Sequence, residues 1–223
     1  LCTDTGDDGL HGCSAVESFR YSLWRIGRGW LVMLATRLKG AGGAGGALLD
    51  LTFYESRYGS NMGSVNVYVV DTSGNIQGSA VYSASGQDGE LGGWAQRTAA
   101  APEVSGDFRI AWHYVSGSSF RGDYAIDTVS LQGNSYNFDS SNDSFVRSYS
   151  NTSSSTLALS NSESVSTSTT NGKWNRDSGG TSSSSTGPSS AQSGAYYMYC
   201  ETSTSGAGFP NINFWLFSPV ITA

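Results

Sequence analysis

The chain has little positive charge, few histidines and no long apolar run. Its 223 residues include 12 lysines and arginines against 18 acidic residues, for a net charge of −6. So few basic side chains do not provide the positive surface that binds nucleic-acid phosphates, and we expect no nucleic-acid partner. The most apolar run, Trp30–Ala35, is six residues long, whereas a membrane-spanning helix needs roughly 20. We therefore expect no insertion into a membrane.

Proline and cysteine are also scarce, with four and three residues, but 38% of the chain is hydrophobic and 12% is aromatic. This composition is sufficient for a buried core, so we expect a folded chain with serine- and glycine-rich loops. The cysteines are Cys2, Cys13 and Cys200. We predict a disulfide between Cys2 and Cys13, which contributes about 3 kcal/mol in the chain-entropy account. Three reduced thiols in a cytosolic protein are the alternative.

Alternation of apolar and polar residues predicts an all-β protein. Every second residue is apolar over Leu49–Tyr54 and Val65–Val69, and Asp71–Asn75 has the Asx and glycine chemistry of a hairpin loop. The same alternation recurs over Phe108–Tyr114 and, apart from one aspartate, over Ala125–Leu131. Strand signals separated by about eight to twelve residues are typical of an antiparallel β-sandwich.

Serine, threonine, asparagine and glycine dominate residues 139–192, which we predict to be long loops with short strands. Two N-x-S/T sequons lie there, at Asn142 and Asn151, and both are predicted glycosylation sites. Strand patterns return over Ala195–Glu201 and Ile212–Ile221.

The first 43 residues have a different character. Five of the twelve basic side chains lie between positions 20 and 39, among aromatic and aliphatic residues. An amphipathic helix and a partner-binding strand both fit this pattern, although Gly27 and Gly29 would each weaken a helix by roughly 1 kcal/mol. Gly40–Gly46 is typical of a flexible tether. We predict an arm that folds back on its own domain or docks on a neighbouring subunit.

Several segments match one known module. FRIAWHYVSGSSFRGDYAIDTVSL at Phe108–Leu131 carries a Gly-Asp-x-Ala-x-Asp-x-Val-x-Leu string, and WNRDSGGTSSSSTGPSSAQSGAYYMYCETS at Trp174–Ser203 carries Thr-Gly-Pro and Gly-x-Tyr-Tyr-x-Tyr. With Asn137–Asp139 and FWLFSPVI at Phe214–Ile221, they resemble the MAM domain, an extracellular jelly-roll module of receptor phosphatases, meprins and neuropilins. The resemblance covers residues 47–221 and implies an antiparallel jelly-roll sandwich. The usual four cysteines of that family are not found, so no disulfide carries over.

The order of the two halves is reversed relative to that family. After the arm at 1–43, residues 44–131 resemble the C-terminal half and residues 132–223 the N-terminal half. If the chain is circularly permuted, Ile221 lies near Ala47 and one molecule closes the sandwich. Alternatively, halves of neighbouring subunits complete each other by domain swapping, which can propagate into a filament. Both arrangements fit the sequence.

No catalytic pattern is found. The strands carry no carboxylate pair with glycosidase spacing, Ser14 lacks a Gly-x-Ser-x-Gly elbow, and His11 and His113 form no zinc motif. We therefore expect no enzymatic activity, and we predict that His113 is a half-exposed sheet residue. Tyrosines on strands either form a sugar-binding face by stacking or, more often, line the edge of a β core: Tyr68, Tyr82, Tyr196, Tyr197 and Tyr199.

An acidic group is the candidate metal site. Asp127 is predicted to share a face with the apolar Ala125 and Val129, so its carboxylate needs a partner or a cation. Asp123 precedes it on a turn. The resemblance adds Asp139, because some MAM domains bind calcium through acidic residues in this region. We predict a calcium ion held by the three aspartates. Hydrogen bonds from backbone N–H groups to Asp127 are the alternative.

The expected function is that of a non-enzymatic, extracellular structural or adhesive subunit. It would lie at a cell or virion surface and associate with copies of itself into a surface assembly, such as a glycosylated filament. The alternatives are a jelly-roll module whose partner is a carbohydrate, and a viral surface or fibre protein.

Overall fold

A computed structural model describes residues 24–26, 29–31, 46–88, 93–150, 159–167, 172–203 and 210–223. The chain divides into two compact units, Leu1–Gly45 and Gly46–Ala223. In the first unit, β1 (Trp24–Ile26) pairs antiparallel with β2 (Gly29–Leu31), so these residues are strands and not a helix.

Three of the predicted site residues cannot be placed. Cys2, Cys13 and Asn151 lie outside the described residues, as does most of the predicted arm. The third cysteine, Cys200, is a buried free thiol. Among the described residues, no helix has the length and apolar character needed to cross a membrane.

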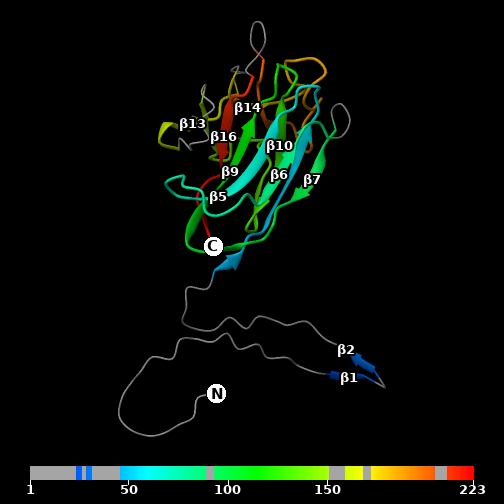
Figure 1. The fold of residues 1–223 in the computed structure, drawn as a ribbon, viewed down its shortest axis with the longest axis vertical. Coiled ribbons are helices and arrows are strands. Elements are labelled where there is room, and N and C mark those ends of the chain that lie inside the picture. The colour runs from blue at the N-terminus through cyan, green and yellow to red at the C-terminus, as the bar shows by residue number, and fades with distance from the viewer. Residues whose placement is uncertain are drawn as a thin grey trace. The chain divides into compact units, whose positions relative to one another are not determined.

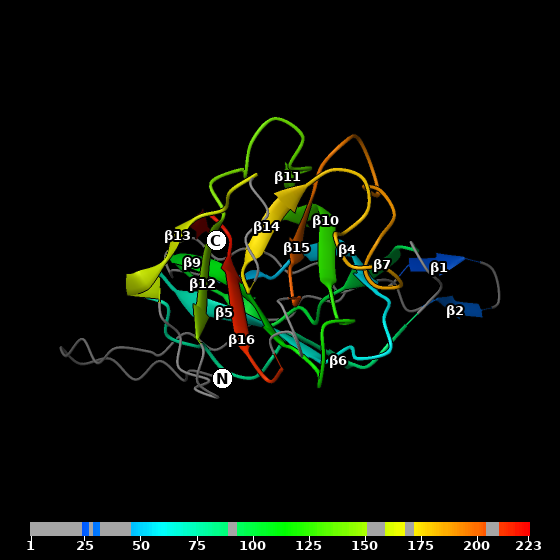
Figure 2. The same cartoon turned by 90° about the horizontal axis from the view of Figure 1, so that it is seen from above.

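The second unit contains two antiparallel sheets, which Figures 1 and 2 show as separate layers. The first, called the β10 sheet here, has the strand order β14–β15–β10–β4–β7, and β11 pairs with the end of β10. Its strands are β4 (Leu51–Arg57), β7 (Ala95–Thr98), β10 (Tyr124–Leu131), β11 (Asn134–Tyr136), β14 (Trp174–Asp177) and β15 (Tyr197–Cys200).

The second, called the β9 sheet here, has the strand order β13–β12–β16–β9–β5–β6, and β17 pairs with the start of β9. A two-stranded pair, β3 (Ala47–Leu48) with β8 (Glu103–Val104), lies outside both sheets. The strands of the β9 sheet are β5 (Ser64–Asp71), β6 (Tyr82–Ser85), β9 (Asp107–Val115), β12 (Val146–Ser150), β13 (Glu163–Ser164), β16 (Asn213–Phe217) and β17 (Ile221–Thr222).

Each sheet combines strands from the two halves of the chain. In the β10 sheet, β15 of the second half pairs with β10 of the first, and in the β9 sheet β16 of the second half pairs with β9 of the first. Both halves therefore close one sandwich within a single chain. The predicted all-β, antiparallel sandwich is confirmed.

Both ends of this unit attach to one short stretch, Glu103–Phe108. At the N-terminal end, Ala47 is the register partner of Val104. At the C-terminal end, Ile221 is the partner of Phe108, and the N–H of Ala223 donates to the carbonyl of Gly106 at 3.0 Å. The two ends thus lie against neighbouring residues, which is the arrangement that a circularly permuted sandwich requires.

The core fills the space between the sheets with aromatic rings. The alternating residues predicted to face inward, such as Phe53 and Trp112, are fully buried, and their rings meet edge to face with centroids 5.8 Å apart. Phe145, from the second half of the chain, lies 6.0 Å from Trp112 and 5.2 Å from Phe138. Hydrophobic packing therefore joins the two halves as well as the two sheets.

One predicted face is wrong. The register between β10 and β4 shifts between Asp127 and Ser130, and Thr128 has a φ of +46°. Such a bulge reverses the alternation of side chains. Ala125 consequently packs with the outer tyrosines, whereas Val129 lies in the core between the sheets. Asp127 therefore does not share a face with Val129.

Replacing Phe145 with alanine should lower the free energy of unfolding by about 3–5 kcal/mol, because the ring leaves a cavity where both halves meet. Urea denaturation followed by circular dichroism measures the change. Ile76→Ala is the control, because Ile76 is 40% exposed and should change stability by less than about 0.5 kcal/mol. Equal losses for the two variants would contradict the central position of Phe145.

Candidate functional site

The three predicted calcium ligands all bind backbone amides of one stretch, residues 192–202. Asp127 Oδ2 accepts N–H bonds from Gln192 (2.8 Å) and Ser193 (3.2 Å). Asp139 Oδ1 accepts from Ala195 (2.7 Å) and Tyr196 (3.1 Å). The third, Asp123, accepts through Oδ1 from the N–H of Thr202 at 3.0 Å. We call these three residues the loop-holding carboxylates.

Of the two alternatives predicted for Asp127, the structure shows hydrogen bonds from backbone N–H groups. Within the described ranges, no group of three or more histidine, cysteine, aspartate or glutamate side chains is placed to hold a metal ion. The loop-holding carboxylates are thus not brought together as one ligand set, and the calcium site stays a prediction. Burial raises the pKa of Asp127 to about 6, while the N–H bonds from Ser193, Thr128 and Gln192 act in the opposite direction.

Asp123 forms a buried carboxyl pair with Glu201, which the sequence pattern did not reveal. Both side chains are fully buried, and Asp123 Oδ2 has no hydrogen-bond partner among the described residues. Glu201 is surrounded by hydroxyl groups: Oε2 accepts from Tyr199 (3.2 Å) and Ser182, and Oε1 accepts from the N–H (2.8 Å) and hydroxyl of Ser203. Burial and then the charge of Glu201 raise the pKa of Asp123 to about 7.

Threonine hydroxyls attach the loop at residues 178–188 to the same place. Thr186 Oγ1 donates to the carbonyl of Tyr58 (3.0 Å) and accepts from the N–H of Asp123 (2.9 Å). Thr181 Oγ1 donates to the carbonyl of Thr186 at 3.0 Å. These threonines belong to the Thr-Gly-Pro region that the resemblance singled out, but only the fold shows that they reach the start of β10. The site as a whole therefore attaches loops to the β10 sheet through hydrogen bonds.

A second charged group, the Glu55 cluster, joins the sheets at another edge. Glu55 Oε1, on β4, accepts from Arg57 Nε (2.8 Å), Arg97 Nε (2.8 Å) and the Tyr82 hydroxyl (2.6 Å). Tyr82 is on β6 of the β9 sheet, and Arg57 Nη1 also donates to the carbonyl of Gly86 at 2.8 Å. Because Glu55 and Arg57 are both buried, each charge depends on the other.

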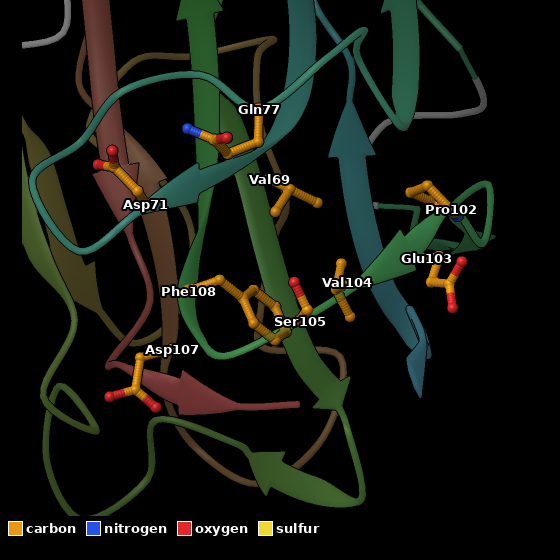
Figure 3. Close-up of a pocket in the computed structure, with 9 residues that line it drawn as sticks. All are labelled: Val69, Asp71, Gln77, Pro102, Glu103, Val104, Ser105, Asp107 and Phe108. Atoms are coloured by element: carbon orange, nitrogen blue, oxygen red, sulfur yellow. The ribbon is translucent and has the colours of Figure 1, made fainter. Parts of the chain in front are cut away.

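Figure 3 shows a hollow between the end of β5, β8 and the start of β9. Its volume of about 220 Å³ is below the ~300–1,000 Å³ of typical ligand pockets. The carboxylate of Asp71 accepts from the N–H groups of Ser73 and Asn75, and that of Asp107 accepts from the Thr222 hydroxyl. These two carboxylates therefore stabilise the rim of the hollow. Its lining residues are Val69, Asp71, Gln77, Pro102, Glu103, Val104, Ser105, Asp107 and Phe108.

The five tyrosines do not form one exposed face. Tyr197 and Tyr199 are fully buried on the outer side of the β10 sheet. Tyr82 reaches the Glu55 cluster, Tyr68 packs near Trp215, and Tyr196 lies under the guanidinium of Arg176. The five tyrosines occupy separate positions at the edges of the core. Of the two predicted roles, this arrangement fits the edge of a β core.

The prediction that His113 is half-exposed is wrong. His113 is only 6% exposed because its ring stacks on Trp215 with centroids 3.8 Å apart. Its Nε2 lies 2.7 Å from Asn213 Oδ1. Burial lowers the pKa of His113, so the imidazole is neutral at pH 7. The outer face of the β9 sheet is therefore a second apolar layer, which alternation alone did not predict.

Asn142, the described sequon, lies half-buried in the turn before β12. Its Nδ2 donates to the carbonyl of Phe145 at 3.2 Å. An amide nitrogen carries two hydrogens, so a sugar on Nδ2 leaves one hydrogen for this bond. Glycosylation at Asn142 stays a prediction.

Comparisons with known proteins identify no family. No family model matches the chain, and no solved structure matches it significantly. The likeness to MAM domains therefore rests on the sequence segments alone.

Stability should fall as pH rises from about 4 to 7. The pKa of Asp123 is about 7 in the folded protein and about 3.9 in an unfolded chain. Between these values the folded state holds a proton that the unfolded state lacks, so the stabilisation is complete below about pH 4 and is lost as pH rises through 7. Asp127, whose pKa is about 6 in the folded protein, adds to the same slope up to about pH 6. Asp123→Asn should therefore make the slope shallower and leave mainly the part below about pH 6, as measured by urea denaturation from pH 4 to 8.

The control for this measurement is Asp139→Asn. Backbone N–H bonds from Ala195 and Tyr196 lower the pKa of Asp139, so its contribution to stability is lost only as pH falls below about 4. The slope between pH 4 and 7 should survive in this variant. Loss of the slope in Asp139→Asn, or a slope in Asp123→Asn as steep as in the unaltered chain, would contradict the assignment.

Glu55→Gln should destabilise the protein by about 3–5 kcal/mol, because it removes the buried carboxylate partner of Arg57 and leaves only the half-exposed Asp88 to balance its charge. Asp88→Asn removes another carboxylate bonded to the same two arginines, but Asp88 is 45% exposed and should cost less than about 1 kcal/mol. Chemical denaturation of both variants measures the difference. Similar losses would mean that burial of Glu55 does not control this cluster.

Proposed function

We propose that the chain is a non-enzymatic structural subunit that associates with copies of itself by exchanging halves of the sandwich. The supporting observation is the way the two halves meet. Residues 46–131 supply one side of each sheet and residues 132–223 the other, and within the sheets they meet at the strand pairs β10–β15 and β9–β16. Either half alone leaves two inner strand edges without partners.

If two chains exchange halves, the contacts formed between the chains are the same as those formed within one chain. If the second half of one chain pairs with the first half of another, the registers of β10–β15 and β9–β16 are unchanged, and so is the packing of Phe145 against Trp112. The balance between closed and exchanged forms is then set by chain concentration and by the link between the halves. Head-to-tail exchange that does not close forms a filament.

The loop-holding carboxylates would help such a subunit to function in a surface assembly. They hold residues 192–202 on the β10 sheet, so this part of the outer surface keeps its shape in either form. We place this assembly outside the cell or on a virion, with sugar on Asn142, in keeping with the sequon and the likeness to an extracellular module.

Introduced thiols test the exchange. Asp107 on β9 and Thr222 on β17 come from different halves, are register partners and are both exposed. In a background without the three native cysteines, Asp107→Cys chains and Thr222→Cys chains are refolded together at high concentration. We expect disulfide-linked pairs on a non-reducing gel, because exchange brings the two thiols together.

The matched control mixes Asp107→Cys chains with Ser184→Cys chains, because Ser184 is exposed in another loop. The double variant Asp107→Cys/Thr222→Cys, refolded at low concentration, should form the disulfide within one chain and shows that the geometry permits the bond. Monomers alone in the mixture, or equal cross-linking with the control, would refute exchange.

A further inference from the structure

Thr128 and Gln192 bring a hydroxyl group and a carboxamide together from distant parts of the chain. Thr128 is on β10 and Gln192 is in the loop before β15, 64 residues further on. The Thr128 hydroxyl donates to Gln192 Oε1 at 2.8 Å, and both side chains are partly buried. An alcohol thus lies against the carbonyl group of an amide.

Asp127 holds the backbones of both residues. Its Oδ1 accepts from the N–H of Thr128 at 2.6 Å, and its Oδ2 accepts from the N–H of Gln192 at 2.8 Å. The carboxylate is fully buried, so it cannot exchange these donors freely for water. Fixing two reacting groups in this way replaces an encounter in solution with a reaction inside one molecule.

The backbone of Thr128 is strained. Its φ of +46° lies in the left-handed region, which a β-branched residue rarely adopts. Glycine or asparagine would fit this bulge with less strain. Strain of this kind is often found where a side chain is used chemically. At this position the strained backbone directs the threonine hydroxyl towards Gln192.

We propose that Thr128 and Gln192 form an internal ester cross-link. A lone pair on Thr128 Oγ1 attacks Gln192 Cδ, and a new C–O bond forms while the bond from Cδ to Nε2 breaks. The hydroxyl proton leaves with the nitrogen, so the second product is ammonia. No electrons are transferred to another reagent, and loss of ammonia into dilute solution drives the step forward. The cross-link joins β10 covalently to the loop that it already holds.

The intact mass of the purified full-length chain tests the proposal. We expect a mass below the calculated value by one ammonia molecule. Proteolysis should then release one peptide that contains both Thr128 and Gln192, and hydroxylamine at neutral pH, which cleaves esters under conditions that leave peptide bonds intact, should separate it into two. A chain at its calculated mass, with the two residues on separate peptides, would overturn the proposal.

Variants at the two positions assign the lost ammonia. Thr128→Ser keeps a hydroxyl group and should keep the mass loss. Thr128→Val keeps the shape without the hydroxyl, and Gln192→Glu removes the leaving nitrogen, so both should have their calculated masses. Circular dichroism shows which variants fold, and the hydroxylamine test on the unaltered chain does not depend on them. A mass loss that persists in folded Thr128→Val would also overturn the proposal.

Discussion

β10 has neighbours on both edges and on both faces, and the rest of the unit is arranged around this constraint. β4 of the first half lies along one edge and β15 of the second half along the other. Its inner face needs apolar residues, while its outer face must hold a loop. The bulge at Thr128 meets both demands, because it places Asp127 outside and Val129 inside.

On the outer side of the β10 sheet, buried carboxylates hold the loops in place of further apolar packing. A long polar segment brings many backbone N–H groups to the sheet, and each needs an acceptor once water is excluded. One carboxylate can accept several of them, and hydrogen bonds to a charged group contribute about 1.5–3 kcal/mol each. The cost is desolvation. Asp123 shows it most clearly, since its second oxygen has no hydrogen-bond partner in the part of the chain that the structure describes, and its pKa rises to about 7.

The sequence predicted the elements better than their contacts. Alternation located the strands around Phe53 and Trp112, because a half-buried strand imposes a period of two. The bulge at Thr128 could not be seen, since it depends on pairing with β4. Alternation showed that Asp127 needs a partner, and Asp123 and Asp139 were predicted only as calcium ligands; the amides that all three bind lie far along the chain. Glu55 and Glu201 were missed for the same reason: nothing local distinguishes a buried glutamate from a solvated one.

The attachment of both ends to Glu103–Phe108 has a mechanical consequence. Tension applied between Gly46 and Ala223 acts first on β3 and β17, each of which is two residues long. From these strands the force passes through a few residues of β8 and the start of β9, and it bypasses most of the two sheets. Stretched as a link in a longer chain, the unit would thus give way at its ends by peeling, while the aromatic core stays closed.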